Sequence, residues 1–157
     1  MKIRHPLFVG LVAAFAVSLA SVVSAVAAET PFKGKVNAVE TVEVVPPTTL
    51  SVTRVGTGTA TYLGKFTEHI TLQVNIPTGH ATGAATFTAA NGDTLTASVD
   101  GQGTPTTTPG VLSVVETYTI TGGTGRFADA TGTLTLEIIA IQATGVSSGT
   151  LSGAIDH

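Results

Sequence analysis

The chain has 157 residues, a formal net charge of −3 and no cysteine. Disulfides therefore cannot stabilise it, and a lipid anchor that needs a cysteine at its cleavage site is excluded. The chain also has no tryptophan and only a few other aromatic residues. Because it lacks both a basic patch and a platform for base stacking, nucleic acid is not an expected partner.

The first 28 residues have the pattern of a secretory signal peptide. Lys2, Arg4 and His5 form a short positive region, and residues 7–23 are almost wholly apolar. Small-residue cleavage sites follow at Ala25, Ala27 and Ala28. The alternative is an uncleaved membrane anchor, since the apolar run approaches the length that spans a bilayer. The pattern favours cleavage, a secreted or periplasmic protein, and no stable membrane insertion afterwards.

Residues 29–157 are expected to form one all-β domain. Threonine, which is β-branched and favours strands, is frequent here, and glycine-rich turns interrupt the chain at short intervals. No long amphipathic helix is indicated, and Asn91-Gly92 is typical of a type I′ hairpin turn. The predicted strands are residues 32–44, 50–62, 65–76, 80–90, 94–101, 111–121, 131–143 and 148–155. Eight short strands with one apolar face favour an antiparallel β-barrel with a filled lumen.

Four charged residues fall on the apolar face that the period-two alternation defines. Glu116 lies between Val114 and Tyr118, while Glu40, Glu68 and Arg54 share the parity of apolar neighbours in their own segments. Burying a lone carboxylate is costly, so it pairs or takes up a proton. Glu40, Glu68 and Arg54 lie near predicted strand ends, where a side chain can reach solvent. A β-bulge, which reverses the parity of the residues beyond it, is another explanation.

Glu116 is the strongest candidate for a functional residue, because alternation is clean on both sides of it. One interpretation is a structural ion pair with Arg54 or Arg126, and the other is a ligand-binding or catalytic role. Tyr118, on the same face, would add its hydroxyl to such a site, or else be a core residue with a satisfied hydroxyl. The candidate ligand-binding set is therefore Glu116, Tyr118, Arg54 and Glu68, with Glu116 the candidate catalytic residue.

The seventh predicted strand is apolar on both faces toward its end. Ile139 and Ile141 would point out of a lone barrel. Since an apolar outer face is normally covered, we expect a homo-oligomer, a dimer or trimer, to form through these two residues. A packed N-terminal arm is the alternative.

The patterns of metal, hydrolase and phosphate sites are missing from the sequence. His69, His80 and His157 are too dispersed for a metal-ligand cluster, and no nucleophile elbow is present. Gly56-x-Gly58 and Gly101-x-Gly103 are interpreted as turn or bulge glycines rather than phosphate loops. The sequence therefore predicts neither a metal nor a cofactor.

The most distinctive stretch is the glycine corner, residues 122–128, with the sequence Gly-Gly-Thr-Gly-Arg-Phe-Ala, followed by Ala130 and Gly132. Gly122, Gly123 and Gly125 permit positive φ, while Arg126 and Phe127 offer a charge and an apolar anchor at the turn. The corner resembles the GGTG-K/R-F turn of dirigent proteins and, more loosely, of allene oxide cyclases. The segment from Val55 to Ala60 is similar to an early dirigent strand.

This resemblance implies an eight-stranded barrel that trimerises and holds an apolar substrate without a cofactor. The corner itself is architectural in those families and assigns no catalytic residue here. The leading expectation is a protein that binds a small apolar molecule in its lumen near Glu116 and Tyr118. A cofactor-free cyclase or stereochemistry-guiding enzyme is the first alternative, and a structural or envelope protein with a packed lumen is the second.

Overall fold

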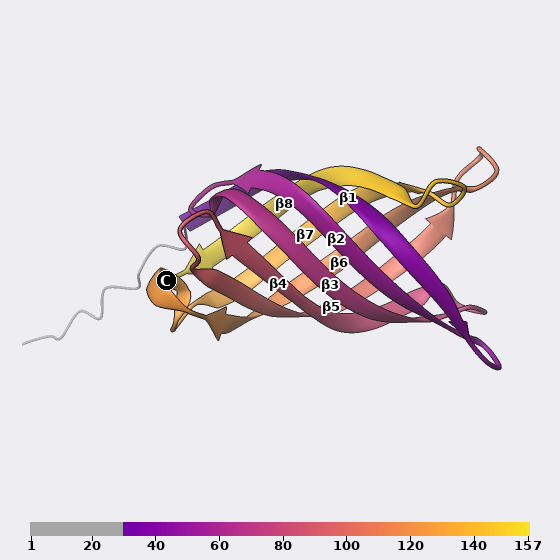
Figure 1. Ribbon diagram of the computed structural model, residues 1–157, viewed down its shortest axis with the longest axis horizontal. Coiled ribbons are helices and arrows are strands. Elements are labelled where there is room, and N and C mark those ends of the chain that lie inside the picture. Colours follow the sequence, from indigo (N-terminus) through magenta and orange to yellow (C-terminus); the bar gives the residue numbers. More distant parts are fainter. Residues whose placement is uncertain (1–29) are drawn as a thin grey trace, which may run out of the picture.

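The computed structural model describes residues 30–157 and is a closed eight-stranded antiparallel β-barrel (Figure 1). Each strand pairs with the next in the chain, and β1 closes the barrel against β8. The strands are β1 (Thr30–Val45), β2 (Thr49–Ala60), β3 (Gly64–Asn75), β4 (His80–Ala89), β5 (Thr94–Pro105), β6 (Val111–Gly123), β7 (Thr131–Ile141) and β8 (Val146–Asp156). The predicted fold class is confirmed. The predicted signal peptide, residues 1–28, lies outside the described residues.

The register of the barrel is regular apart from one β-bulge. In the β5–β6 pair, Thr96 lies opposite Gly122 and Ala97 opposite Ile120, so β6 has one extra residue at this point. The bulge lies close to the glycine corner and far from Glu116. The inward parity predicted for Glu40, Arg54, Glu68 and Glu116 therefore holds.

The glycine corner closes one end of the barrel. Gly122 and Gly125 have positive φ, and Gly125–Phe127 forms a short 3₁₀ helix, η1. Phe127 is fully buried, and Arg126 lies over its ring and pairs with Asp93 at 3.6 Å. Arg126 is thus not the partner of Glu116. The glycine corner thus has a structural role, as its sequence predicts.

The lumen is densely filled toward this same end. Three aromatic rings pack in series, with centroid separations of 5.6 Å for Phe66–Phe87 and 5.7 Å for Phe87–Tyr118. β1 begins at this end and β8 finishes there, so both ends of the described chain lie on the packed side (Figure 1). Other buried residues of the packed half include Phe32, Leu63, Leu95, Phe127, Leu134 and Ile155.

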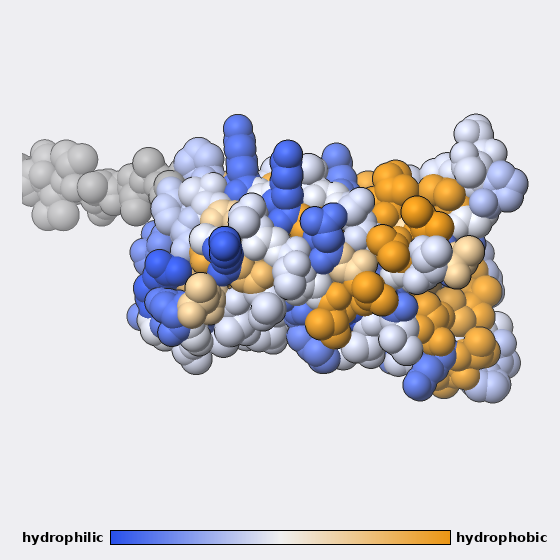
Figure 2. Space-filling model, turned by 45° about the horizontal axis from the view of Figure 1, so that its top comes forward, coloured by the Kyte–Doolittle hydropathy of each residue, from blue (hydrophilic) through white to orange (hydrophobic). Residues whose placement is uncertain are grey.

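The lumen is open at the opposite end of the barrel. The outer surface of the barrel wall near this end is apolar. Figure 2 shows hydrophobic side chains gathered on the half of this face that lies away from the packed end. Ile139 and Ile141 are exposed there, at 46% and 42%, as the sequence predicts. The described residues contain no helix long and apolar enough to cross a membrane.

Candidate functional site

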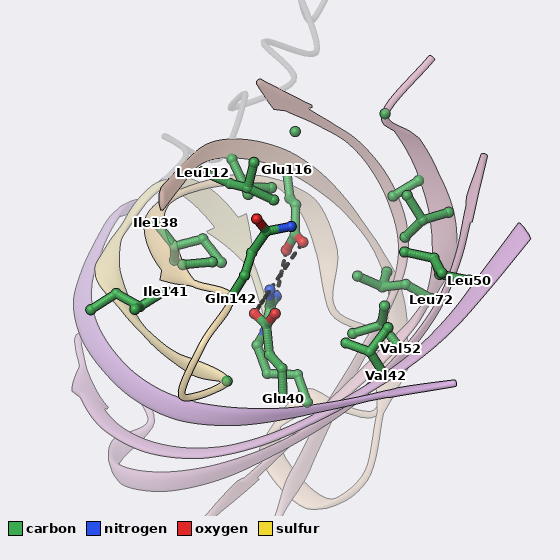
Figure 3. A pocket seen from close by; sticks show the side chains of 18 residues that line it. Glu40, Val42, Leu50, Val52, Leu72, Leu112, Glu116, Ile138, Ile141 and Gln142 are labelled. Atoms are coloured by element: carbon green, nitrogen blue, oxygen red, sulfur yellow. Dashed lines mark hydrogen bonds and ion pairs between the residues drawn. The ribbon is translucent and has the colours of Figure 1, made fainter. Parts of the chain in front are cut away.

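The candidate site is a cavity of about 280 Å³ in the open half of the lumen. Its wall is mainly apolar, and its polar groups come from Arg54, Glu116, Glu40 and Gln142 (Figure 3). The apolar lining residues are Val42, Leu50, Val52, Leu72, Val74, Ala81, Leu112, Val114, Ile138, Ala140 and Ile141. An apolar cavity with a few convergent polar groups is the usual form of a small-molecule site.

Arg54 is the centre of the polar groups and lies across the lumen from Glu116. β2 and β6 are not neighbours in the barrel, so the contact crosses the interior. The Arg54 side chain is 2% exposed, and its Nη1 donates to Glu116 Oε1 at 3.0 Å and its Nη2 to Oε2 at 2.5 Å. This is a bidentate pair, the geometry that gives an arginine–carboxylate contact its directionality. The predicted structural pairing of Glu116 with an arginine is present, and Arg54 is the partner.

Tyr118 completes the same hydrogen-bond network. Its hydroxyl accepts from Arg54 Nη2 at 2.6 Å and donates to Glu116 Oε2 at 2.5 Å. Burial raises the pKa of Tyr118 well above its usual value, and the nearby Glu116 adds to the rise while Arg54 opposes it. The hydroxyl therefore keeps its proton and remains a donor to the carboxylate.

Two further acids face the same guanidinium at longer range. Arg54 Nε lies 3.5 Å from Glu68 Oε1, and Arg54 Nη1 lies 3.6 Å from Glu40 Oε1. Glu68 is fully buried and neither of its oxygens has a hydrogen-bond partner in the described structure, whereas the Glu40 side chain keeps 17% exposure. Glu68 is thus enclosed beside the network, while Glu40 opens toward the cavity.

Burial changes the proton affinity of Glu68. It raises the pKa of this carboxyl to about 7, opposed by Arg54 and supported by the charges of Glu116 and Glu40. A buried acid without hydrogen bonds holds its proton more tightly, because the ionised form has lost its solvation. Glu68 is therefore largely protonated below neutral pH.

Glycines in the strands make room for these large inward side chains. Gly56 lies opposite Glu68 and Gly101 opposite Glu116 in the strand registers. A Cβ at Gly56 would lie 2.9 Å from Glu68 Oε1, and one at Gly101 would lie 2.8 Å from Glu116 Cγ. The interpretation of Gly56-x-Gly58 and Gly101-x-Gly103 as turn or bulge glycines was wrong. All four lie within regularly paired strands.

Gly58 acts in the same way in the packed half. A Cβ there would lie 2.4 Å from the Phe66 ring. Alternate inward glycines on β2 thus accommodate a carboxylate at one level of the barrel and an aromatic ring at the next. This is one of the recognised roles of glycine inside a strand, where it permits close approach of a neighbouring group.

The structure brings together all four members of the predicted ligand-binding set, although only Arg54 and Glu116 line the cavity. The explanation that Glu40, Glu68 and Arg54 reach solvent at strand ends was wrong for Arg54 and Glu68, which are buried. Sequence reasoning missed Gln142, although it lies within the predicted strand 131–143 with the parity of Ile138 and Ala140, because only charged residues on the apolar face were selected. In the structure β7 ends at Ile141, and Gln142 begins the turn to β8. Glu40 was found by parity but not selected for the site.

Among the described residues, no group of three or more histidine, aspartate or glutamate side chains is arranged to hold a metal ion. His80 pairs instead with Asp100 at 3.0 Å on the exposed part of the barrel. Comparison with known proteins adds no relative: no family model, curated protein or solved structure matches the chain. The function must therefore be argued from the geometry of this barrel.

Proposed function

We propose that this protein binds a small apolar molecule in the open half of its lumen. The observation that carries the proposal is the cavity of about 280 Å³, with an apolar wall and the Arg54–Glu116 pair among its lining groups. This volume lies near the lower end of the ~300–1,000 Å³ typical of ligand pockets. The resemblance of the glycine corner to dirigent and allene oxide cyclase barrels, which hold apolar substrates, supports the same function.

The polar network supports a binding function more directly than a catalytic one. Both oxygens of Glu116 already accept hydrogen bonds from Arg54 or Tyr118. For Glu116 to act on a substrate, at least one of these bonds would have to be exchanged. The cofactor-free enzyme remains the alternative, and a barrel with only a structural role is favoured less because the cavity is not filled by side chains.

A matched pair of valines tests the proposal. Val114 lines the cavity, and the next residue, Val115, is exposed on the outer face of the same strand. We expect Val114→Trp to fill the cavity and weaken binding of the neutral dye N-phenyl-1-naphthylamine by about tenfold or more, while Val115→Trp leaves it unchanged. The readout is dye fluorescence, with far-UV circular dichroism as the check on folding. Equal binding by both variants would contradict a lumen site.

Native mass spectrometry of protein purified from its own host gives a second test. A small molecule released on denaturation would reveal the class of the natural ligand. The mass of the same sample would also test the proposed secretion, because cleavage after Ala25, Ala27 or Ala28 gives three different masses. An intact leader would contradict that proposal.

We also propose that the apolar outer face joins copies of this chain. Val55, Val39, Val146 and Ile141 lie directly opposite one another on β2, β1, β8 and β7, which makes a continuous row. All four are more than 40% exposed, and none carries a charge that a second copy would repel. A closed barrel has no free strand edge, so association through side chains of this face is the available route.

The oligomer is tested by light scattering coupled to size-exclusion chromatography. We expect Ile139→Ser combined with Ile141→Ser to convert a dimer or trimer to a monomer, because it removes the apolar contact from β7. A double substitution of Thr133 and Thr135 to serine, on the same strand toward the packed end, is the control. A wild-type protein that is monomeric at tens of micromolar would overturn the proposal.

A further inference from the structure

The polar end of the cavity also indicates which apolar molecules it would accept, an inference that rests on the proposed binding function. One guanidinium, that of Arg54, faces three carboxyl groups, those of Glu40, Glu68 and Glu116. Even with the proton held on Glu68, the cluster has more negative than positive groups. The cavity therefore opposes an anionic head group.

Three of the five N–H groups of Arg54 are engaged in hydrogen bonds. Its two terminal nitrogens donate to Glu116 and Tyr118, and its Nε is buried without a hydrogen bond on the side of Glu68. Nη1 keeps one further N–H and lies 3.6 Å from Glu40 Oε1, so an anion that approached it would meet the negative charge of this carboxylate. The arginine thus serves to hold Glu116 and does not offer a ready anion site.

Glu40 is the acid with free acceptors toward the cavity. Its contact with Arg54 Nη1 is 3.6 Å, beyond hydrogen-bond distance, and within residues 30–157 its carboxylate accepts no hydrogen bond. Its backbone is fixed, because Glu40 N donates to Gly145 O at 2.7 Å. A carboxylate that is held in place and half-enclosed has capacity for a donor from a ligand.

Gln142 contributes a second polar group at the same level. It extends from the β7–β8 turn into the space in front of Glu40 and Glu116 (Figure 3). Its backbone is tied to the β5–β6 loop, since Gln142 N donates to Gly110 O at 2.9 Å. The carboxamide oxygen is an additional acceptor at the mouth.

We propose that the ligand is an apolar amine, with its hydrocarbon part against the valine and leucine wall and its ammonium donating to Glu40. At 3.6 Å, the contact of Arg54 Nη1 with Glu40 is a charge contact without a hydrogen bond, so the carboxylate keeps its acceptors for the ligand. The Gln142 carboxamide oxygen is available as a second acceptor in the same cavity. A head group that only accepts hydrogen bonds would leave both of these acceptors without a partner.

The test uses three eight-carbon competitors that differ only in their head group. Octylamine, octanol and octanoate displace N-phenyl-1-naphthylamine from the full protein at pH 7.5. We expect octylamine to compete at a concentration about tenfold lower than octanol, and octanoate to be the weakest, because a charge-assisted hydrogen bond is added in the first case only.

Substitutions of Glu40 test whether this residue causes the preference for the amine. Glu40→Gln should lose the preference for octylamine over octanol, whereas Glu40→Asp, which keeps the charge, should retain much of it. Glu43→Gln is the matched control, because Glu43 lies on the same strand and is exposed on the outer face. Calorimetric titration with octylamine measures the same preference without the dye.

The outcomes separate the two proposals. Dye binding with equal competition by all three compounds, or with octanoate the strongest, would overturn the amine assignment and leave the lumen site intact. The absence of both dye binding and octylamine heat would overturn the lumen site as well. Retention of the amine preference in Glu40→Gln would also overturn the assignment.

Discussion

The two halves of this barrel share the same eight strands but differ in the size of the side chains that enter the lumen. Toward the chain ends, phenylalanine, tyrosine and leucine fill the interior. Toward the mouth, the inward positions include Ala81, Ala140 and Gly103, and a cavity of about 280 Å³ remains. Because one closed backbone serves both halves, the cavity results from side-chain volume and not from the architecture of the sheet.

A layer of charge divides the two halves. Arg54, Glu116 and Tyr118 bond to one another across the lumen, and Glu68 and Glu40 lie beside them. The packed half is filled by buried apolar side chains, while the open half has polar groups at its floor. We therefore expect substitutions in the charged layer, the packed half and the open half to change stability by different amounts.

The largest loss of stability is expected when Arg54, the cation of the charged layer, is removed. Arg54→Leu leaves three buried or half-buried acids without a counter-charge, and the loss of one partner of a buried pair costs about 3–5 kcal/mol. Urea denaturation of the variant should show this loss or failure to fold. Arg126→Leu, which removes an exposed arginine of the glycine corner, should cost well under half as much. Equal losses would contradict the central role of the layer.

The next largest effect is the change of stability with pH that Glu68 causes. The folded protein keeps the Glu68 proton up to a pKa of about 7, while an unfolded chain loses it near 4.5. The unfolded state then binds fewer protons between these pH values, so the contribution of Glu68 makes stability fall as pH rises through this window, by about 3 kcal/mol in total.

Glu68→Gln should remove that contribution. Thermal unfolding should show the variant gaining stability over the wild type between pH 4.5 and 8, with little difference below pH 4.5. Glu43→Gln, on the outer face, is the control and should not change the pH profile. A parallel profile for Glu68→Gln and the wild type would mean that Glu68 ionises as freely as a solvent-exposed acid.

The smallest effect on stability is expected from matched substitutions at two alanines of one strand, one in each half of the barrel. Ala85 of β4 lies in the packed core and Ala81 of the same strand lines the cavity. Ala85→Leu should overpack the core and cost about 1–3 kcal/mol. Ala81→Leu should enter existing space, cost less and reduce dye binding. If Ala81→Leu destabilised the protein as much as Ala85→Leu, the open half would be packed as tightly as the other.

Much of the fold follows from local patterns in the sequence. Alternation places Leu72 and Val114 inward, and the Asn91-Gly92 turn separates β4 from β5, whereas the fifth strand extends to Pro105 beyond its predicted end at residue 101. The same parity identified Glu116 as an inward charge in mid-strand, which is why the candidate site lies close to the predicted residues. These features depend on one strand or one turn at a time.

Other features require the register of several strands. The choice of Arg54 over Arg126 as partner of Glu116 depends on which residues of β2 and β6 face each other across the lumen. The role of Gly56 depends on its position opposite Glu68 on the neighbouring strand. The free volume of the open half likewise depends on the sizes of the side chains that all eight strands place at one level. No single segment of the sequence determines it.

The described chain, residues 30–157, begins and ends at the packed end of the barrel, which bears on how the molecule can be attached to anything else. Thr30 pairs with Ile155, so the first and last strands leave the barrel at one pole. The mouth of the cavity, with Val42 and Ile141 in its lining, lies at the other pole. A tether, a fused domain or a sensor surface joined at either end would hold the barrel by its base, with the cavity facing outward and free to exchange its contents.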